Sequence, residues 1–200
     1  MMIPSRTLTK TGLLIAAVTL SACTSTSGVS TTSAKTYSVM VCSGYGCEYT
    51  SRLSLAARDM GHIRNTLKRS KNAQQERAAI AKLVSWKEKL AERKLRFPKD
   101  VKLSYQPYRG IRGHMDCIDE SNNTLAFLQF LAREKLLKFH SVKGTATRGF
   151  LLDFRHPHTT AVIKENSGVE WSVDSWTKNS GAAPDVEPLS VWRKKRTEDG

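Results

Sequence analysis

The sequence predicts an α+β fold in which a central helix packs on a small antiparallel sheet, with additional helices on the N-terminal side. Residues 73–95 carry apolar side chains at spacings of three and four, which is typical of a helix face packed on a core. Residues 125–132 are apolar nearly all round except Gln129, which indicates a buried helix. After residue 150, short β-branched and aromatic segments alternate with turn residues, as in antiparallel strands.

The first residues predict export. A basic start precedes an apolar run from Gly12 to Leu20, which is too short to span a bilayer as a stable anchor. The run ends in Leu20-Ser21-Ala22-Cys23, which resembles the bacterial lipoprotein signal. That resemblance implies that residues 1–22 are a signal peptide and that Cys23 is the lipid attachment site. Because Thr24 follows, it also implies an outer-membrane location facing the periplasm. The alternative is an ordinary signal peptide with Cys23 as a bystander.

Residues 23–35 are predicted to be a tether between the lipid and a folded body. Eight of the ten residues from Thr24 to Ser33 are serine or threonine, so this segment has little to bury. Residues 36–200 are long enough for a single domain with its own core, whose catalytic part would be about residues 113–176.

The chain is strongly basic, with 32 Lys and Arg against 18 Asp and Glu and a net charge of +14. Much of the excess lies between Arg64 and Lys102, which holds thirteen basic and four acidic residues. An exported protein rarely meets nucleic acid, and no aromatic-rich binding motif accompanies the charges, so we expect no nucleic-acid partner. The segment fits either an anionic lipid or cell-wall surface or a solvated helix face.

The N-terminal half of the domain is expected to hold one strand and two helices. Residues 36–41 are predicted to be a strand and residues 56–68 a helix. Asn72 is a typical N-cap residue with a glutamine three positions later, which predicts a helix from about Ala73 to Leu95. The apolar face of that helix comprises Ala79, Leu83, Trp86 and Leu90. Residues 97–115 contain two prolines and two glycines and are expected to form an irregular connection of the kind that often borders an active site.

The C-terminal half is expected to begin with the central helix, with Cys117 in its first turn. Three strands should follow, namely Phe150–Phe154, Thr159–Ile163 and Glu170–Val173. The sequence Glu165-Asn166-Ser167-Gly168 predicts a hairpin turn between the last two strands. A short closing helix is expected at Pro188–Arg193, around Trp192.

The cysteine count singles out Cys117. With Cys23 assigned to lipid, three cysteines remain, and an oxidising compartment favours pairing. Cys42 and Cys47 are separated by Ser-Gly-Tyr-Gly, a segment flexible enough to close a small disulfide loop. That pairing leaves Cys117 as a free thiol. The alternative is that Cys117 pairs with one of the other two.

A nucleophile, a base and an orienting acid follow from the predicted elements. A helix N-terminus and a nearby imidazolium both favour the thiolate, so we expect a lowered pKa at Cys117. Counting outward from Asn166, His158 lies eight residues before the turn and Asp174 eight after it. In that register the two face each other across the ladder, which suits a carboxylate that orients an imidazole. His156 has no acid opposite it.

Each of these residues also has an ordinary structural interpretation. Cys117 can be a small buried hydrophobe. His158 can be a surface or satisfied core residue, and Asp174 can cap a turn. The order of cysteine at a helix start, then histidine and aspartate across a hairpin, favours the catalytic interpretation.

Three segments together resemble the transglutaminase-like branch of the papain-like cysteine hydrolases. They are Asp116-Cys117-Ile118-Asp119, His158-Thr159-Thr160-Ala161-Val162 and Trp171-Ser172-Val173-Asp174-Ser175-Trp176. The same three segments resemble those of uncharacterised bacterial envelope lipoproteins with a transglutaminase-like core. The resemblance implies a papain/transglutaminase-like fold with Cys117 as nucleophile, His158 as general base and acid, and Asp174 as orienter. It also implies acyl transfer on peptide or isopeptide bonds of a protein or peptide substrate, by hydrolysis or amine cross-linking.

Two further interpretations stay open at this point. Relatives of this class include calcium-dependent proteinases, and Asp116, Asp119 and Glu120 offer oxygen ligands, although acids at a helix start more often serve the helix dipole. Calcium therefore stays possible, and the sequence assigns no metal or other cofactor. The second interpretation is a catalytically inactive envelope lipoprotein that uses the same fold as a binding module. Thr159 directly after the histidine, and a glycine displaced to Gly113, differ from the family pattern and favour that alternative.

Overall fold

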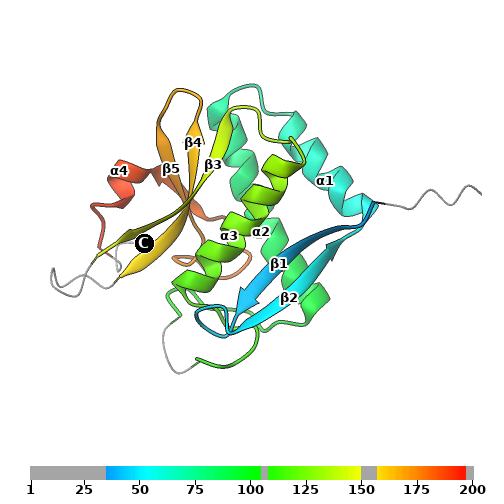
Figure 1. Cartoon of the computed structure of the whole chain (residues 1–200), viewed down its shortest axis with the longest axis vertical. Coiled ribbons are helices and arrows are strands. Elements are labelled where there is room, and N and C mark those ends of the chain that lie inside the picture. Colours follow the sequence, from blue (N-terminus) through cyan, green and yellow to red (C-terminus); the bar gives the residue numbers. More distant parts are fainter. Residues whose placement is uncertain (1–34, 105–107, 150–156, 197–200) are drawn as a thin grey trace, which may run out of the picture. The chain divides into compact units, whose positions relative to one another are not determined.

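The computed structural model describes residues 35–104, 108–149 and 157–196. Within these ranges the chain forms four helices and two antiparallel sheets, so the predicted α+β class is confirmed (Figure 1). The elements in chain order are β1 (Tyr37–Ser43), β2 (Tyr49–Leu55), α1 (Ala57–Lys68), α2 (Ala73–Leu95), α3 (Cys117–Arg133), β3 (His140–Arg148), β4 (His158–Glu165), β5 (Glu170–Asp174), β6 (Asp185–Pro188) and α4 (Leu189–Trp192).

The two N-terminal helices follow directly from local sequence signals. The Asn72 side chain accepts a hydrogen bond from the Gln75 backbone N–H at 2.9 Å, which caps the start of α2. The helix then spans Ala73–Leu95, as predicted, and Arg96 ends it in the left-handed conformation at φ 56°. The predicted apolar face is buried at Ala79, Leu83 and Leu90, and Trp86 packs against the same core.

The central helix α3 contacts β1 on one side and β3 and β4 on the other, and Figure 1 shows it between the hairpin and the four-stranded sheet. Asp116 is its N-cap, so Cys117 is its first helical residue. Phe127, Leu128 and Leu131 are fully buried in its second half. The prediction of a buried helix packed on an antiparallel sheet is therefore confirmed.

The four-stranded sheet has the order β3-β4-β5-β6, with every neighbouring pair antiparallel. In the β4–β5 hairpin, Ala161 lies opposite Val173 and Lys164 opposite Glu170. The turn is thus centred one residue later than Asn166, and the predicted direct pairing of His158 with Asp174 is wrong. The error shifts the pairing by two residues, which leaves both side chains on the same face of the sheet as diagonal neighbours.

Several strands were not predicted from the sequence. β2, β3 and β6 are rich in Ser, Thr or charged residues and carry few large apolar side chains, so their local signal is weak. The predicted helix around Trp192 is present as α4. The predicted strand Phe150–Phe154 lies outside the described residues, as do the signal peptide, Cys23 and most of the tether. Of the helices that the structure describes, none is long and apolar enough to cross a membrane.

Candidate active site

Cys117 lies where α3 meets β4. The Asp116 carboxylate accepts from the Asp119 backbone N–H at 2.8 Å, and the Asp119 carboxylate accepts from the Asp116 N–H at 3.4 Å, which forms a reciprocal capping box. This cap fixes the first turn of α3 and the half-buried Cys117 within it. Burial raises the pKa of the Cys117 thiol, and the backbone of Thr159, at the start of β4, acts in the opposite direction.

His158 directly precedes Thr159 and begins β4, the strand that packs against α3. The ring is fully buried, and its Nε2 lies 2.6 Å from Oδ2 of Asp174. A carboxylate at that distance makes Nε2–H the donor and leaves Nδ1 as the acceptor nitrogen. Nδ1 is buried and, within the part of the chain that the structure describes, has no hydrogen-bond partner.

Two tryptophans enclose the imidazole, and their role was missed in the sequence. The ring of Trp176 lies 4.8 Å from that of His158 and the ring of Trp192 lies 5.6 Å from it, measured between centroids. The indole Nε1–H of Trp192 donates to Oδ2 of Asp174 at 2.7 Å. The sequence marked Trp192 as the centre of a short helix, but nothing local connects α4 to an acid on β5.

Arg148 makes two contacts with Trp192. Its Nη1 donates to the Trp192 carbonyl at 2.6 Å, and its guanidinium lies 4.5 Å from the centroid of the indole ring. Arg148 is also the residue paired with His158 across the β3–β4 ladder. Arg148, the last residue of β3, therefore contacts both β4, which carries His158, and α4, which carries Trp192.

The electrostatics of the thiol differ from the sequence-based expectation. The pKa of Cys117 is raised to about 11, mainly by burial; the charges of Asp116 and Asp174 also raise it, and the Thr159 and Cys117 amides lower it. The expected lowering of this pKa at the helix N-terminus is therefore wrong for the free protein. At neutral pH the thiol is protonated and needs a base to become a nucleophile.

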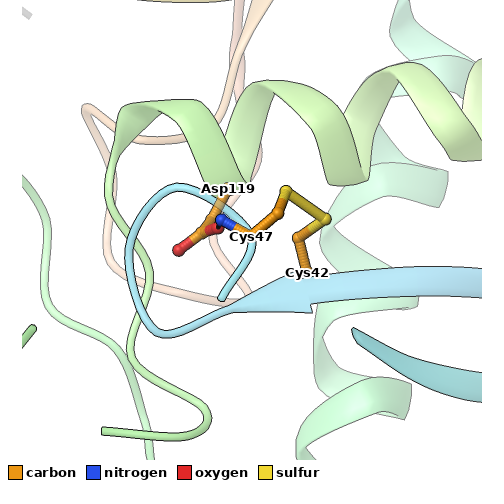
Figure 2. Close-up of side chains that lie close together, drawn as sticks. All are labelled: Cys42, Cys47 and Asp119. Atoms are coloured by element: carbon orange, nitrogen blue, oxygen red, sulfur yellow. Dashed lines mark hydrogen bonds between the residues drawn. A yellow bond between two sulfur atoms is a disulfide. The ribbon is translucent and has the colours of Figure 1, made fainter. Parts of the chain in front are cut away.

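A disulfide-closed loop borders the start of α3 (Figure 2). Cys42 and Cys47 are bonded to each other, which leaves Cys117 as the free cysteine of the described residues. The Asp119 carboxylate accepts from the Tyr45 N–H at 2.7 Å and from the Cys47 N–H at 2.5 Å. The loop is thus fixed twice, by its own disulfide and by a buried acid of α3.

The three acids considered as calcium ligands have separate partners. Asp116 caps α3, Asp119 binds the disulfide loop, and Oε2 of the buried Glu120 accepts from the Ser175 hydroxyl at 3.0 Å. Among the described residues, the one group of three metal-type side chains close enough to share an ion is Cys42, Cys47 and Asp119. Its two sulfurs are joined in the disulfide, so they are not thiolate ligands.

The other described histidines lie in different settings. His62 packs on Trp86, with their ring centroids 4.9 Å apart. His140 lies near the buried Glu76, and His114 stacks on Tyr108 with its centroid 4.5 Å away. His156 lies outside the described residues. Among the described histidines, His158 is the one that hydrogen-bonds Asp174.

The basic segment 64–102 lies on α1, α2 and the connection that follows. Arg77 pairs with Glu165 and lies 3.6 Å from the centroid of the Trp171 ring, and Lys94 pairs with Asp59 at 2.7 Å. Lys87 is buried at 2 % exposure, whereas most of the other cations are exposed. The contacts of the thiol and the imidazole described above do not involve this segment.

No family model, curated protein or solved structure matches the chain. Function is therefore inferred from the geometry and chemistry of the residues themselves.

Proposed function

We propose that the protein is an acyl-transfer enzyme that works through a thioester on Cys117, with a papain/transglutaminase-like core. The observation that carries the proposal is the buried pair of His158 and Asp174, whose Nε2 and Oδ2 lie 2.6 Å apart, on two strands that contact the helix beginning at Cys117. A carboxylate that holds an imidazole in one tautomer is the usual support for a base that activates a sulfur nucleophile at a helix start.

In this proposal the buried Nδ1 of His158 takes the proton of the Cys117 thiol as the sulfur attacks a carbonyl carbon. Because the thiol pKa is raised, this transfer accompanies the attack rather than preceding it. The amine of the peptide or isopeptide bond then leaves with the proton from His158, which forms the thioester. Water or a second amine attacks the thioester, His158 takes the proton of the attacking group, and the thiol is regenerated.

The charge that develops on the carbonyl oxygen needs hydrogen-bond donors. The backbone N–H of Cys117 lies in the first turn of α3, where no partner within the helix is available to it, and it can serve as one donor. We place a second donor in the region of residues 105–108, of which 105–107 lie outside the described residues. The proposal rests on the sulfur, the imidazole and the acid.

The cellular setting of the proposal comes from the sequence. We propose a lipid-anchored envelope protein, attached through Cys23 and facing the periplasm, with protein or peptide substrates. The exposed cations of segment 64–102 fit an anionic lipid or cell-wall surface. Replacement of Cys23 by Ser should abolish lipid modification, measured by mass spectrometry of the membrane fraction, and an unchanged lipidated form would contradict the anchor.

The test of the enzymatic proposal is reaction of Cys117 with iodoacetamide at pH 7.5, followed by mass spectrometry of the peptide that carries this residue. Native protein should react faster than the His158→Gln variant by roughly 10- to 100-fold, because the base is lost. Thermal unfolding of both proteins controls for misfolding, and the Cys117→Ser variant confirms the labelled site. Equal rates in two folded proteins would exclude His158 as the base.

A second candidate function is an inactive binding module with the same fold. The raised thiol pKa favours this binding function, because a cysteine that does not act as a nucleophile needs no stabilised thiolate. A Cys117 that stays inert toward iodoacetamide in the folded protein would favour this function over catalysis.

A further inference from the structure

A cavity of about 260 Å³ lies beside the first turn of α3. Its lining comprises Tyr45, Gly46, Arg109, Asp116 and Ile118. Asp116 and Ile118 are the two sequence neighbours of Cys117. Ile118 lies in the first turn of α3 and is 45 % exposed. The cavity therefore adjoins the helical turn that carries Cys117, although the thiol itself is not part of its lining.

The wall opposite α3 is built from two segments that are tied together. The Gly110 N–H donates to the Gly44 carbonyl at 3.0 Å, and the Gly44 N–H donates to the His114 carbonyl at 2.7 Å. The Tyr49 hydroxyl adds a bond of 3.2 Å to the Gly110 carbonyl. These bonds join the disulfide loop to the segment that carries Arg109, so that segment is held beside the loop rather than free.

The loop is also fixed to α3, as the two amide bonds to the Asp119 carboxylate show. One acid in the first turn of the nucleophile helix therefore positions Tyr45 and Gly46, and the loop in turn positions the segment of Arg109. The cavity is preorganised by covalent and hydrogen-bonded links between all of its walls. A preorganised cavity loses less free energy to ordering when a ligand enters it.

The two charged side chains that line the cavity are not equivalent. The Asp116 carboxylate serves as the N-cap of α3, where it accepts from the Asp119 N–H at 2.8 Å. Arg109 is exposed, and in the part of the chain that the structure describes its guanidinium makes no hydrogen bond or ion pair. Arg109 is thus the charged group of this cavity that is available to a ligand.

We infer that this cavity binds a carboxylate of the acyl donor through Arg109, so that the substrate class is an acidic peptide or isopeptide with a carboxylate close to the reacting carbonyl. A guanidinium matches a carboxylate through two parallel hydrogen bonds, which fixes orientation as well as charge. The carboxylate would lie on the Tyr45 and Arg109 side of the cavity, away from Asp116. This inference rests on the proposed function, because it assigns specificity to the same thiol.

The test uses two reagents that alkylate the same sulfur and release iodide in the same way. Iodoacetate carries a carboxylate next to the reacting carbon, and iodoacetamide carries a neutral amide of nearly the same size. The rate of each at Cys117 is measured in the full-length protein by quantitative peptide mass spectrometry. The ratio of the two rates is then divided by the ratio for the same chain in denaturant with its disulfide intact, which removes the intrinsic difference between the reagents.

Native protein should show a corrected preference for iodoacetate, and Arg109→Gln should reduce that preference roughly 3- to 10-fold by removing a nearby positive charge. Arg109→Lys should keep most of it, because the charge remains. Lys102→Gln is the matched control, since it removes an exposed cation from the same connection that does not line the cavity. Its preference should equal that of the native protein.

The outcomes separate the inference from the proposed function. A preference that falls in Arg109→Gln and not in Lys102→Gln supports the carboxylate site. Equal preferences in native protein and Arg109→Gln, at native rates with iodoacetamide, overturn the carboxylate site and leave the nucleophile intact. A Cys117 that neither reagent alkylates in the folded protein overturns both.

Discussion

Trp192 and Asp174 are joined by a buried hydrogen bond in which the indole Nε1–H donates to Oδ2 at 2.7 Å. The same oxygen accepts from Nε2 of His158 at 2.6 Å. The three residues are at most 2 % exposed, so the bonds form away from solvent. Through this shared oxygen the short helix α4, at the end of the described chain, helps to orient the candidate base.

Replacement of Trp192 by Phe should weaken this arrangement while keeping an aromatic ring against His158. We expect a loss of about 1–3 kcal/mol in unfolding free energy, because a buried hydrogen bond to a charged acceptor is removed. The rate of Cys117 alkylation at pH 7.5 should fall several-fold, because the acid that orients His158 becomes less constrained. Both quantities are measured on the same preparation, by chemical denaturation and by peptide mass spectrometry.

The matched control is Trp171→Phe. Its indole nitrogen belongs to the same sheet but has no hydrogen-bond partner among the described residues. The alkylation rate should then stay at the native value. An equal loss of rate in both variants would mean that general loosening of the sheet, rather than the bond to Asp174, controls the reactivity of Cys117.

The pH dependence of Cys117 alkylation should report its raised pKa. Because burial raises this pKa to about 11, the rate in native protein should keep rising through pH 10, whereas an ordinary thiol levels off near pH 9. Asp116→Asn should move the profile to lower pH, since it removes a charge that raises the pKa while an asparagine still caps the helix. A native profile that is already flat at pH 7 would show instead a preformed thiolate.

The disulfide loop should contribute measurably to stability. Replacement of both Cys42 and Cys47 by Ala opens a loop of sequence separation 5, and loop-closure entropy then predicts a loss of about 2 kcal/mol. Asp119→Asn should cost about 1–3 kcal/mol, because one of the two backbone N–H groups loses its acceptor. Urea denaturation of each variant measures these losses. If both variants kept native stability, the loop would not be part of the cooperative fold.

Buried acids on α2 and in the connection after it should make the protein less stable at alkaline pH. Burial raises the pKa of Glu88 to about 8 and that of Asp100 to about 7, so the folded state binds more protons than the unfolded state between about pH 5 and pH 8. The free energy of unfolding should therefore fall as pH rises through this window, by at most about 1.4 kcal/mol per pH unit for each of the two groups.

Glu88→Gln should flatten this dependence, because the amide can still accept the hydrogen bond from the Gly181 N–H and no longer titrates. Urea denaturation of native protein and variant at pH 5.5 and pH 8.5 provides the comparison. Stability that rises with pH in the native protein would contradict the sign argued here.

Local sequence signals located the helices well, since a cap and a periodic face act within a few residues. Asn72 and the spacing of Ala79, Leu83 and Leu90 predicted the bounds of α2, and the acids around Cys117 marked the start of α3. The hairpin signal was less exact, because a turn can centre on either of two neighbouring residues without changing its composition. The pairing of β4 with β5 therefore had to come from the structure.

The sequence by itself determined the α+β class, the helix that begins at Cys117, and the three residue types of the candidate site, because each depends on short-range periodicity or chain chemistry. Only the tertiary structure decided that His158 and Asp174 meet as diagonal neighbours, that Trp192 of α4 shares the acid, and that burial raises the pKa of the thiol. These depend on contacts between residues of different elements, and on how much solvent the packed elements exclude, which no local pattern encodes.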